Sequence, residues 1–218
     1  MKAAQYVADF LVEHGVTHNF MVTGGGAMQL DDALGHKEGL HNIFNHNEQG
    51  CSIAAEAYAR TTGKIASVCV TSGPGGTNAI TGVMGGWLDS IPMFIISGQV
   101  KRETTLWSVP NLKLRQLGDQ EFDIIHSVSN MTKYAVMVTE PNDIAYHLEK
   151  AWYLANHGRK GPVWLNSAFD QRLQDITGNR FILVFPDTSS LHNRLYYVIF
   201  ITIVFLFFIG RNRTGNSC

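Results

Sequence analysis

One carboxylate stands where a helix would present it to a ligand. The segment 46–60 follows a short apolar run, and Glu48 lies in its first turn, ahead of an alanine-rich stretch. A glutamate in that place can donate or accept a proton in catalysis, or it can simply balance the partial positive charge of the helix N-terminus. Composition alone favours the second role, so a catalytic role needs further groups close to Glu48.

Two glycine-rich loops are the next candidates for chemistry. Gly24-Gly25-Gly26 and Gly73-Pro74-Gly75-Gly76 each follow a short apolar run directly. Neither loop completes the G-x-G-x-x-G pattern of a dinucleotide site, because Gln29 and Asn78 stand where the third glycine is needed. Tight turns would explain the glycines, and a ligand other than a dinucleotide would explain them as well.

The elements that must position these residues alternate along the chain. Six short apolar runs predict strands at 19–22, 41–44, 65–71, 93–97, 132–136 and 163–166. A first helix is predicted over 2–14, ended by Gly15, and crossover helices are predicted over 48–60, 78–88 and 142–156. This rhythm predicts an α/β domain over residues 1–170, a doubly wound, mostly parallel six-stranded sheet with helices on both faces. Ligands of such sheets bind at the carboxyl ends of the strands.

Composition narrows the class of protein. The 218 residues carry 17 Lys and Arg against 18 Asp and Glu, so the sequence has no electrostatic basis for binding nucleic acid. Three cysteines, Cys51, Cys69 and Cys218, form no CxxC, which argues against a disulfide framework and for a reducing compartment. The first ten residues lack the long apolar region of a signal peptide, so we expect a cytoplasmic location.

The C-terminal part has a different character. We interpret 171–194 as an irregular linker and 195–218 as an apolar segment with a basic tail. The uncharged run 195–209 is shorter than the roughly 20 residues of a typical membrane-spanning helix. Three explanations stay open: a membrane anchor, the translated end of a shifted or truncated gene, and a buried core segment.

Several segments together resemble a known family. His46 to Arg60, HNEQGCSIAAEAYAR, resembles the glutamate segment of thiamine-diphosphate-dependent enzymes, and more narrowly of the acetolactate synthase (acetohydroxyacid synthase) large-subunit group. Further matching segments occur in the family's order, namely Gly24-Gly25 with Asp32-Ala33-Leu34, Thr71 to Asn78, Asp89 to Pro92 with Ser97 to Val100, and Gln120 to Asp123. The resemblance covers about residues 1–170, which would be the family's N-terminal, pyrimidine-binding domain.

The resemblance implies a role for each matching residue. Glu48 would be catalytic, bonding the pyrimidine N1′ of thiamine diphosphate and promoting activation of the cofactor, which supplies the carbanion chemistry. Gln120 would face the substrate. The residues implied to bind the cofactor are Gly24, Gly25, Thr71, Ser72, Gly73, Pro74, Gly75 and Asn78. Thr77 and Asn78 are also expected to cap the helix that follows the second glycine loop.

The resemblance also implies partners and missing parts. The family's enzymes decarboxylate a 2-oxo acid and transfer a two-carbon unit, as in branched-chain amino acid biosynthesis, and work as homodimers. Their Mg²⁺ and the cofactor's diphosphate are bound through a Gly-Asp-Gly motif, which this sequence lacks, and FAD belongs to some full-length members. We therefore expect no metal site here and no activity of the isolated chain, so its status as an enzyme stays open. The alternative is a non-catalytic truncated or membrane-tethered dimerisation module, pairing with itself or with a full-length subunit.

Some positions depart from the family pattern. Val22-Thr23 replaces the usual aromatic residue and proline before the glycines, residues 100–116 differ from the typical connection, and Ser167-Ala168-Phe169-Asp170 ends the domain differently. The donor and acceptor acids therefore stay unspecified. Asp31 and Asp32 are adjacent, so their side chains point in different directions, and we interpret both as first-turn helix charges.

Overall fold

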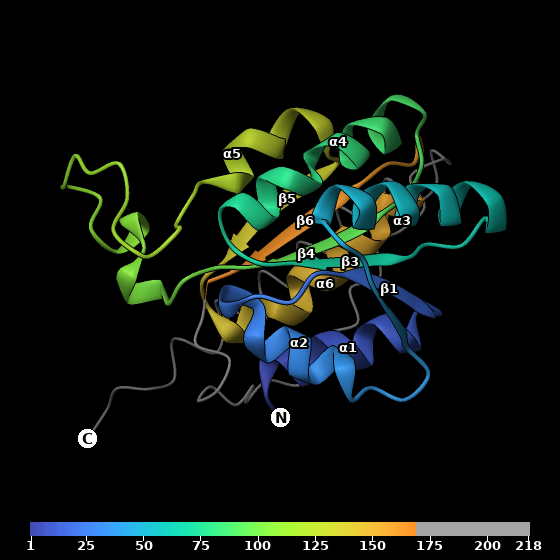
Figure 1. The fold of residues 1–218 in the computed structure, drawn as a ribbon, viewed down its shortest axis with the longest axis horizontal. Coiled ribbons are helices and arrows are strands. Elements are labelled where there is room, and N and C mark those ends of the chain that lie inside the picture. Colours follow the sequence, from blue (N-terminus) through green and yellow to red (C-terminus); the bar gives the residue numbers. More distant parts are fainter. Residues whose placement is uncertain (169–218) are drawn as a thin grey trace, which may run out of the picture. The chain divides into compact units, whose positions relative to one another are not determined.

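Six parallel strands form one sheet, which confirms the predicted fold class (Figure 1). The strands are β1 His18–Met21, β2 His41–Phe44, β3 Ser67–Val70, β4 Phe94–Gly98, β5 Tyr134–Val138 and β6 Val163–Ser167. Their order across the sheet is β2-β1-β3-β4-β6-β5, and every neighbouring pair is parallel. All six predicted strands are present, with ends displaced by a few residues.

This computed structural model describes residues 1–168. The predicted linker 171–194 and the apolar segment 195–218 lie outside the described residues. Among the helices within 1–168, none is both long enough and apolar enough to cross a membrane.

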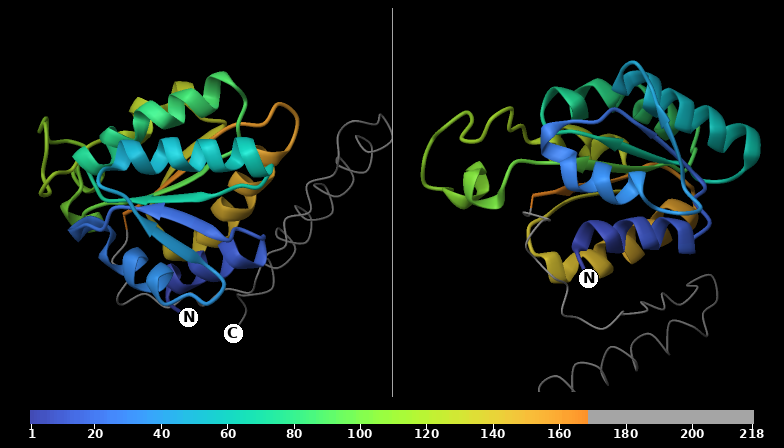
Figure 2. Two further views of the ribbon diagram at one scale, coloured as in Figure 1. Left: turned by 45° about the vertical axis from the view of Figure 1, so that its right-hand side comes forward. Right: turned by 60° about the horizontal axis from the view of Figure 1, so that its bottom comes forward.

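Helices cover both faces of the sheet (Figures 1 and 2). On one face lie α1 Ala3–Glu13, α2 Met28–Gly35 and α6 Ile144–Asn156. On the other face lie α3 Glu48–Thr62, α4 Pro74–Leu88 and α5 Ile124–Val128. Short 3-10 turns complete the connections, namely η1 Gly25–Ala27, η2 Arg102–Thr104, η3 Leu106–Ser108, η4 Ser129–Met131 and η5 Pro141–Asp143.

The sheet separates two hydrophobic cores because successive strand residues point to opposite faces. Phe94 and Ile96 of β4 enter the core beneath α1, α2 and α6. Ile95 enters the other core, together with Trp164 of β6. Burial of the central strands on both faces explains why they read as continuous apolar runs in the sequence.

The start of α4 corrects one prediction. The helix begins at Pro74 rather than at 78, with Gly73 as its N-cap residue. Gly73 has φ +54°, a conformation that favours glycine, and proline is well suited to the first helical position. Thr77 and Asn78 therefore lie inside the helix, and the expectation that they cap it is wrong. The side chain of Asn78 does not cap α4 but forms a hydrogen bond to another helix, described below.

The strand order creates the place for a site. β1 lies between β2 and β3, and the chain leaves β1 toward α2 on one face but leaves β3 toward α4 on the other. The loops after β1 and β3 therefore diverge from neighbouring strand ends. In an open parallel sheet such a switch point leaves a crevice at the carboxyl edge, which is where ligands bind.

Candidate functional site

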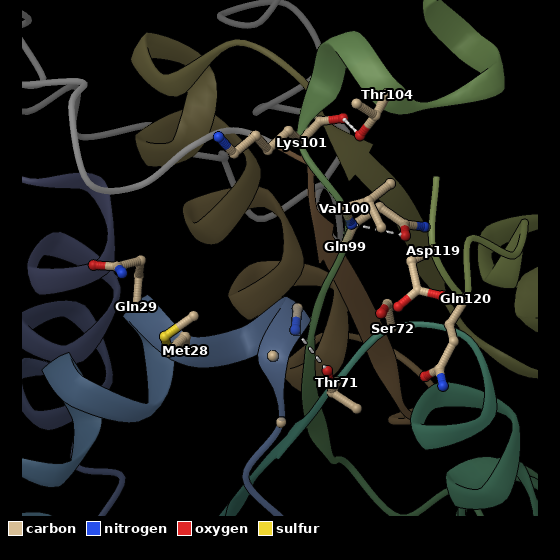
Figure 3. A pocket seen from close by; sticks show the side chains of 13 residues that line it. Met28, Gln29, Thr71, Ser72, Gln99, Val100, Lys101, Thr104, Asp119 and Gln120 are labelled. Atoms are coloured by element: carbon tan, nitrogen blue, oxygen red, sulfur yellow. Dashed lines mark hydrogen bonds between the residues drawn. The ribbon is translucent and has the colours of Figure 1, made fainter. Parts of the chain in front are cut away.

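A cavity of about 540 Å³ lies at that carboxyl edge (Figure 3). Its walls come from the loops after β1, β3 and β4 and from the start of α2. The residues that line it are Gly24, Gly25, Gly26, Met28, Gln29, Thr71, Ser72, Gln99, Val100, Lys101, Thr104, Asp119 and Gln120. The two glycine-rich segments singled out in the sequence thus meet in space.

The loop after β1 touches the end of β3 directly. The Gly26 N–H donates to Thr71 Oγ1 at 3.0 Å, the contact drawn in Figure 3. A Cβ added to Gly24 would lie 2.5 Å from Thr71 Cβ, and one added to Gly26 would lie 2.7 Å from Ser72 Oγ. Only glycine allows this approach at Gly24, because no side chain fits between the loop and Thr71.

Gln120 closes the opposite side of the cavity. Figure 3 shows Asp119 and Gln120 across from Met28 and Gln29 of α2. Gln120 has φ +55°, which is uncommon for a residue with a side chain, and a Cβ on Gly73 would lie 2.2 Å from its carbonyl oxygen. Backbone held in this way is concentrated at functional sites, so the packing of Gly73 fixes where Gln120 is presented.

Glu121 supports Gln120, and the sequence reading missed its role. The Glu121 carboxylate accepts from three backbone N–H groups, those of Leu106 at 2.6 Å, Leu117 at 3.0 Å and Gly118 at 3.2 Å. These bonds tie together the long connection between β4 and α5 next to Gln120. The sequence offered no signal for this role, because Glu121 is one of two glutamates in this connection and its bond to Leu106 joins residues 15 apart along the chain.

Glu48 is the first residue of α3, as the sequence predicts. The Asn47 side chain caps this helix by accepting from the Gly50 N–H at 2.7 Å. The Asn78 Nδ2 group donates to Glu48 Oε2 at 2.7 Å, which links the first turn of α3 to the second turn of α4. The side chain of Asn78 thus orients the glutamate.

Gly75 lies next to both Glu48 and Thr71. A Cβ on Gly75 would lie 3.4 Å from Glu48 Oε1 and 2.7 Å from Thr71 Cγ2. Glu48 itself is half-buried and is not among the residues that line the cavity, but its Oε1 and Thr71 Cγ2 both face the space beside Gly75. The Glu48 carboxylate therefore lies close to Thr71, one of the residues that form the cavity wall.

Asp31 is a further residue of the site that the sequence reading explained incompletely. Its Oδ2 accepts from the Gly24 N–H at 3.1 Å, and Cys69 Sγ lies 3.7 Å from its Oδ1. Burial raises the pKa of Asp31 to about 6, against bonds from Gly24 and Cys69 that lower it. Neighbouring Asp32 points to solvent. The signal was present: Asp31 falls on the apolar stripe of its helix, between the buried Leu30 and Leu34.

All the predicted site residues meet at the carboxyl edge of the sheet. Gly24, Gly25, Thr71, Ser72 and Gln120 line the cavity. The others, Glu48, Gly73, Pro74, Gly75 and Asn78, form the adjoining starts of α3 and α4. Within residues 1–168 no group of three or more His, Cys, Asp or Glu side chains could hold a metal ion.

Comparison with known proteins shows which family the chain resembles. Residues 1–127 match the family described as "Thiamine pyrophosphate enzyme, N-terminal TPP binding domain". The acetolactate synthase large subunit of Buchnera aphidicola (from Acyrthosiphon pisum) is 34% identical over 193 residues, which are 88% of this chain and 32% of that protein. The Haemophilus influenzae large subunit is 39% identical over 163 residues, 75% of this chain and 27% of that protein.

A third relative extends the same result. The acetolactate synthase isozyme 3 large subunit of Escherichia coli is 33% identical over 195 residues, 88% of this chain and 32% of that protein. The chain thus spans about a third of the length of the curated relatives it matches. Because the family match takes in more than half of the 218 residues and the fold agrees with it, this chain belongs to the thiamine pyrophosphate enzymes and carries their N-terminal TPP binding domain.

Proposed function

We propose that this chain supplies the pyrimidine-binding part of an acetolactate-synthase-like enzyme that decarboxylates a 2-oxo acid and transfers a two-carbon unit. One observation carries the proposal: the Glu48 carboxylate is held by Asn78 at the start of α3, and its Oε1 faces Gly75 close to Thr71. The similarity to acetolactate synthase large subunits supports the reaction class.

The residues present fit the pyrimidine half of thiamine diphosphate. An aminopyrimidine is flat, with an apolar ring and polar ring nitrogens. It needs a close backbone wall and one side chain able to share a proton. Gly24 and Gly75 both bring their backbone against Thr71, so closely that an added Cβ would lie 2.5 Å from Thr71 Cβ and 2.7 Å from Thr71 Cγ2, and Glu48 lies next to Gly75. Thr71, Ser72, Gly73, Pro74 and Gly75 would form the wall.

Glu48 would act on the bound ring through one oxygen. Asn78 donates to Oε2 and so fixes the plane of the carboxyl group, which leaves Oε1 toward Gly75. That oxygen would share a proton with the ring nitrogen N1′. Bound thiamine diphosphate supplies a carbon nucleophile and an electron sink for decarboxylation. Gln120, fixed by Gly73 and Glu121, would face the 2-oxo acid.

Mg²⁺ and the cofactor's diphosphate would be bound in the proposed whole enzyme outside this domain, and FAD belongs only to some of the enzymes that the chain resembles. We assign none of them to a side chain among residues 1–168. For the 218-residue chain with thiamine diphosphate and Mg²⁺, we expect calorimetry to detect no saturable binding below millimolar concentration. A micromolar dissociation constant would contradict that expectation.

Thiamine itself tests the pyrimidine site, because it presents the ring without a diphosphate. We expect NMR titration of the ¹⁵N-labelled 218-residue chain with thiamine to shift the amides of Glu48, Thr71 and Gly75 with a millimolar dissociation constant. Glu48→Gln should weaken binding about tenfold, since a charge-assisted hydrogen bond is worth roughly 1.5–3 kcal/mol.

Glu38→Gln is the matched control. It makes the same chemical change at an exposed glutamate in the turn after α2, away from the site, and should leave thiamine binding unchanged. Shifts confined to residues remote from the carboxyl edge, or equal affinity of wild type and Glu48→Gln, would refute the proposed role of Glu48.

A second candidate function is pairing without catalysis, and one observation favours it. Helices α3 and α4 pack side by side on one face of the sheet and expose large apolar side chains, Ile53, Met84 and Leu88. Met84 and Leu88 lie one turn apart, so they share a helix face. We propose that this face pairs with a second copy of the chain or with the corresponding subunit of a full-length enzyme.

Charge placed on that face tests the pairing. We expect sedimentation equilibrium of the 218-residue chain to show a dimer that Leu88→Glu weakens at least about tenfold, because a buried, unpaired carboxylate opposes association. Leu112→Glu changes an equally apolar, exposed residue in the loop before α5 and should not alter the dimer. A monomer at all concentrations, or equal effects of the two variants, would count against this face.

A further inference from the structure

Asp31 is a half-buried acid that the proposed chemistry does not use. It lies in the first turn of α2, whose Leu30 and Leu34 are fully buried in the core beneath the sheet. A carboxylate on such a face loses hydration, which is unfavourable unless hydrogen bonds replace the water. Two groups face it: the Gly24 N–H, 3.1 Å from Oδ2, and the Cys69 thiol, 3.7 Å from Oδ1.

The bond from Gly24 to Asp31 is one of two hydrogen bonds that hold the loop 24–26 in the cavity wall. Asp31 bonds the first glycine of the loop, and the third glycine, Gly26, bonds Thr71 Oγ1 at 3.0 Å. The loop is thus tied at one end to α2 and at the other to the end of β3. Gly25, between the two tethers, lines the cavity and has no atom within 4 Å of an added Cβ.

We propose that ionised Asp31 is a positioning residue that holds the Gly24–Gly26 loop against Thr71, and that taking up a proton at Asp31 loosens the loop and changes the cavity wall. A carboxylate accepts a backbone N–H bond about twice as strongly as a neutral carboxyl group does. The inference rests on the proposed function only in naming the pyrimidine ring as the ligand that this wall would contact.

Among the titratable groups that lie together here, Asp31 is the one that changes its charge near neutral pH. The pKa of Asp31 is raised to about 6, chiefly by burial. The facing Cys69 on β3 stays a neutral thiol throughout, because burial raises its pKa well above the usual 9. Cys51 on α3, the next thiol beyond Cys69, also has a pKa raised by burial, to about 11.

Charged groups on the helices nearby are paired with each other. On α2 itself, exposed Asp32 lies 3.3 Å from His36. From α1, which packs on α2, Asp9 lies 2.6 Å from Lys37. Within residues 1–168 no cation pairs with Asp31, so no opposite charge on these elements offsets the effect of burial.

The test follows the loop amides by NMR in the 218-residue chain without thiamine. From about pH 8 to about pH 5, we expect the Gly24 amide signal to titrate with a midpoint near the pKa of Asp31. After correction for intrinsic exchange, Gly24 hydrogen exchange should rise about tenfold over that range.

Three variants separate the possibilities. Asp31→Asn keeps an oxygen acceptor but cannot titrate, so its Gly24 signal should not move with pH. Asp31→Ala should show fast Gly24 exchange at every pH. Asp32→Asn, the matched control one residue away, should titrate like wild type. If Asp31→Ala does not fold, wild type and Asp31→Asn still decide the question.

The outcomes also separate this inference from the proposed function. A Gly24 signal that does not titrate in wild type, or that titrates equally in Asp31→Asn, overturns the inference whatever thiamine does. Titration at Gly24 in a chain that fails to bind thiamine supports the inference and counts against the proposed function alone. Where thiamine does bind, its affinity should fall between about pH 7 and pH 5 in wild type but not in Asp31→Asn.

Discussion

At the scale of single residues, the absence of a side chain at Gly24 allows the loop after β1 to approach Thr71 at the end of β3. The loop after β1 lies so close to β3 that a Cβ at Gly24 would stand 2.5 Å from Thr71 Cβ, which is closer than non-bonded carbons can approach. At Gly25, one residue along, an added Cβ would meet nothing within 4 Å. The two positions form a matched pair, since the same substitution creates a clash at Gly24 and none at Gly25.

We therefore expect Gly24→Ala to lower the free energy of unfolding by about 1–3 kcal/mol, because overpacking displaces the loop or β3. Gly25→Ala should change it by less than about 0.5 kcal/mol. Urea unfolding of the two variants measures the difference. Equal free energies of unfolding for the two variants would contradict this expectation and show that the loop can move away from Thr71 without a loss of stability.

The raised pKa of Asp31 predicts a stability effect that depends on pH. Because the folded-state pKa, about 6, lies above the unfolded value near 3.8, the folded chain binds more protons between these values. The contribution of Asp31 to stability therefore falls as pH rises from about 4 to about 6. Its penalty is fully present above that window.

Asp31→Asn removes this penalty. Solvent reaches part of the side chain, so we expect the variant to be more stable than wild type by about 1–2 kcal/mol at pH 8, less than the whole shift would give. The difference should disappear toward pH 4. Urea unfolding at a series of pH values measures it, and a difference independent of pH would show that the charge of Asp31 is not its cause.

At the scale of elements, the connection between β4 and α5 is held together by one carboxylate. Glu121 accepts from the N–H groups of Leu106, Leu117 and Gly118. Few residues of this connection are buried, so its order depends on such bonds rather than on apolar packing. The loop and the core should therefore respond to different substitutions.

Glu121→Ala should open this connection while leaving the core intact. Because three backbone donors lose their acceptor, we expect proteolytic cleavage within residues 101–119 to become at least about tenfold faster. The midpoint of global urea unfolding should change little. Glu103→Ala, an exposed glutamate of the same connection, is the control. A loss of global stability without faster local cleavage would contradict the assignment.

At the scale of the whole domain, the centre of the sheet joins distant parts of the chain. Trp164 of β6 is fully buried, and its Nε1 donates to Ser97 Oγ of β4 at 2.8 Å. Ser97 in turn donates to Asn166 Oδ1 at 3.2 Å. This polar contact inside an apolar core is fully satisfied, so it ties β4 to β6 in one register.

Trp164→Phe should destabilise the whole domain. The variant loses a buried hydrogen bond and leaves unfilled volume, for which we expect about 2–4 kcal/mol of lost unfolding free energy. Trp107→Phe replaces a half-exposed tryptophan and should change stability by less than about 1 kcal/mol. Comparable losses in the two variants by urea unfolding would show that Trp164 is not central to the core.

Much of the fold could be read from the sequence because its signals are local. The parallel strands are apolar runs since both faces are buried, and helix ends follow from glycine and capping chemistry, as at Gly15 after α1. The error at the start of α4 has a local cause too: Gly73 and Pro74 suit a tight turn, but a proline also suits the first position of a helix, and the helix begins there.

The sequence by itself determined the fold class, the residues of the two glycine loops, and the place of Glu48 at the start of its helix. Only the tertiary structure decided that Asn78 holds Glu48, that Asp31 bonds Gly24 and that Glu121 supports Gln120. Each of these contacts joins residues whose separation along the chain carries no fixed spacing. Helix and strand periods specify which face a residue occupies, whereas the partner it meets there depends on how the sheet brings separate elements together.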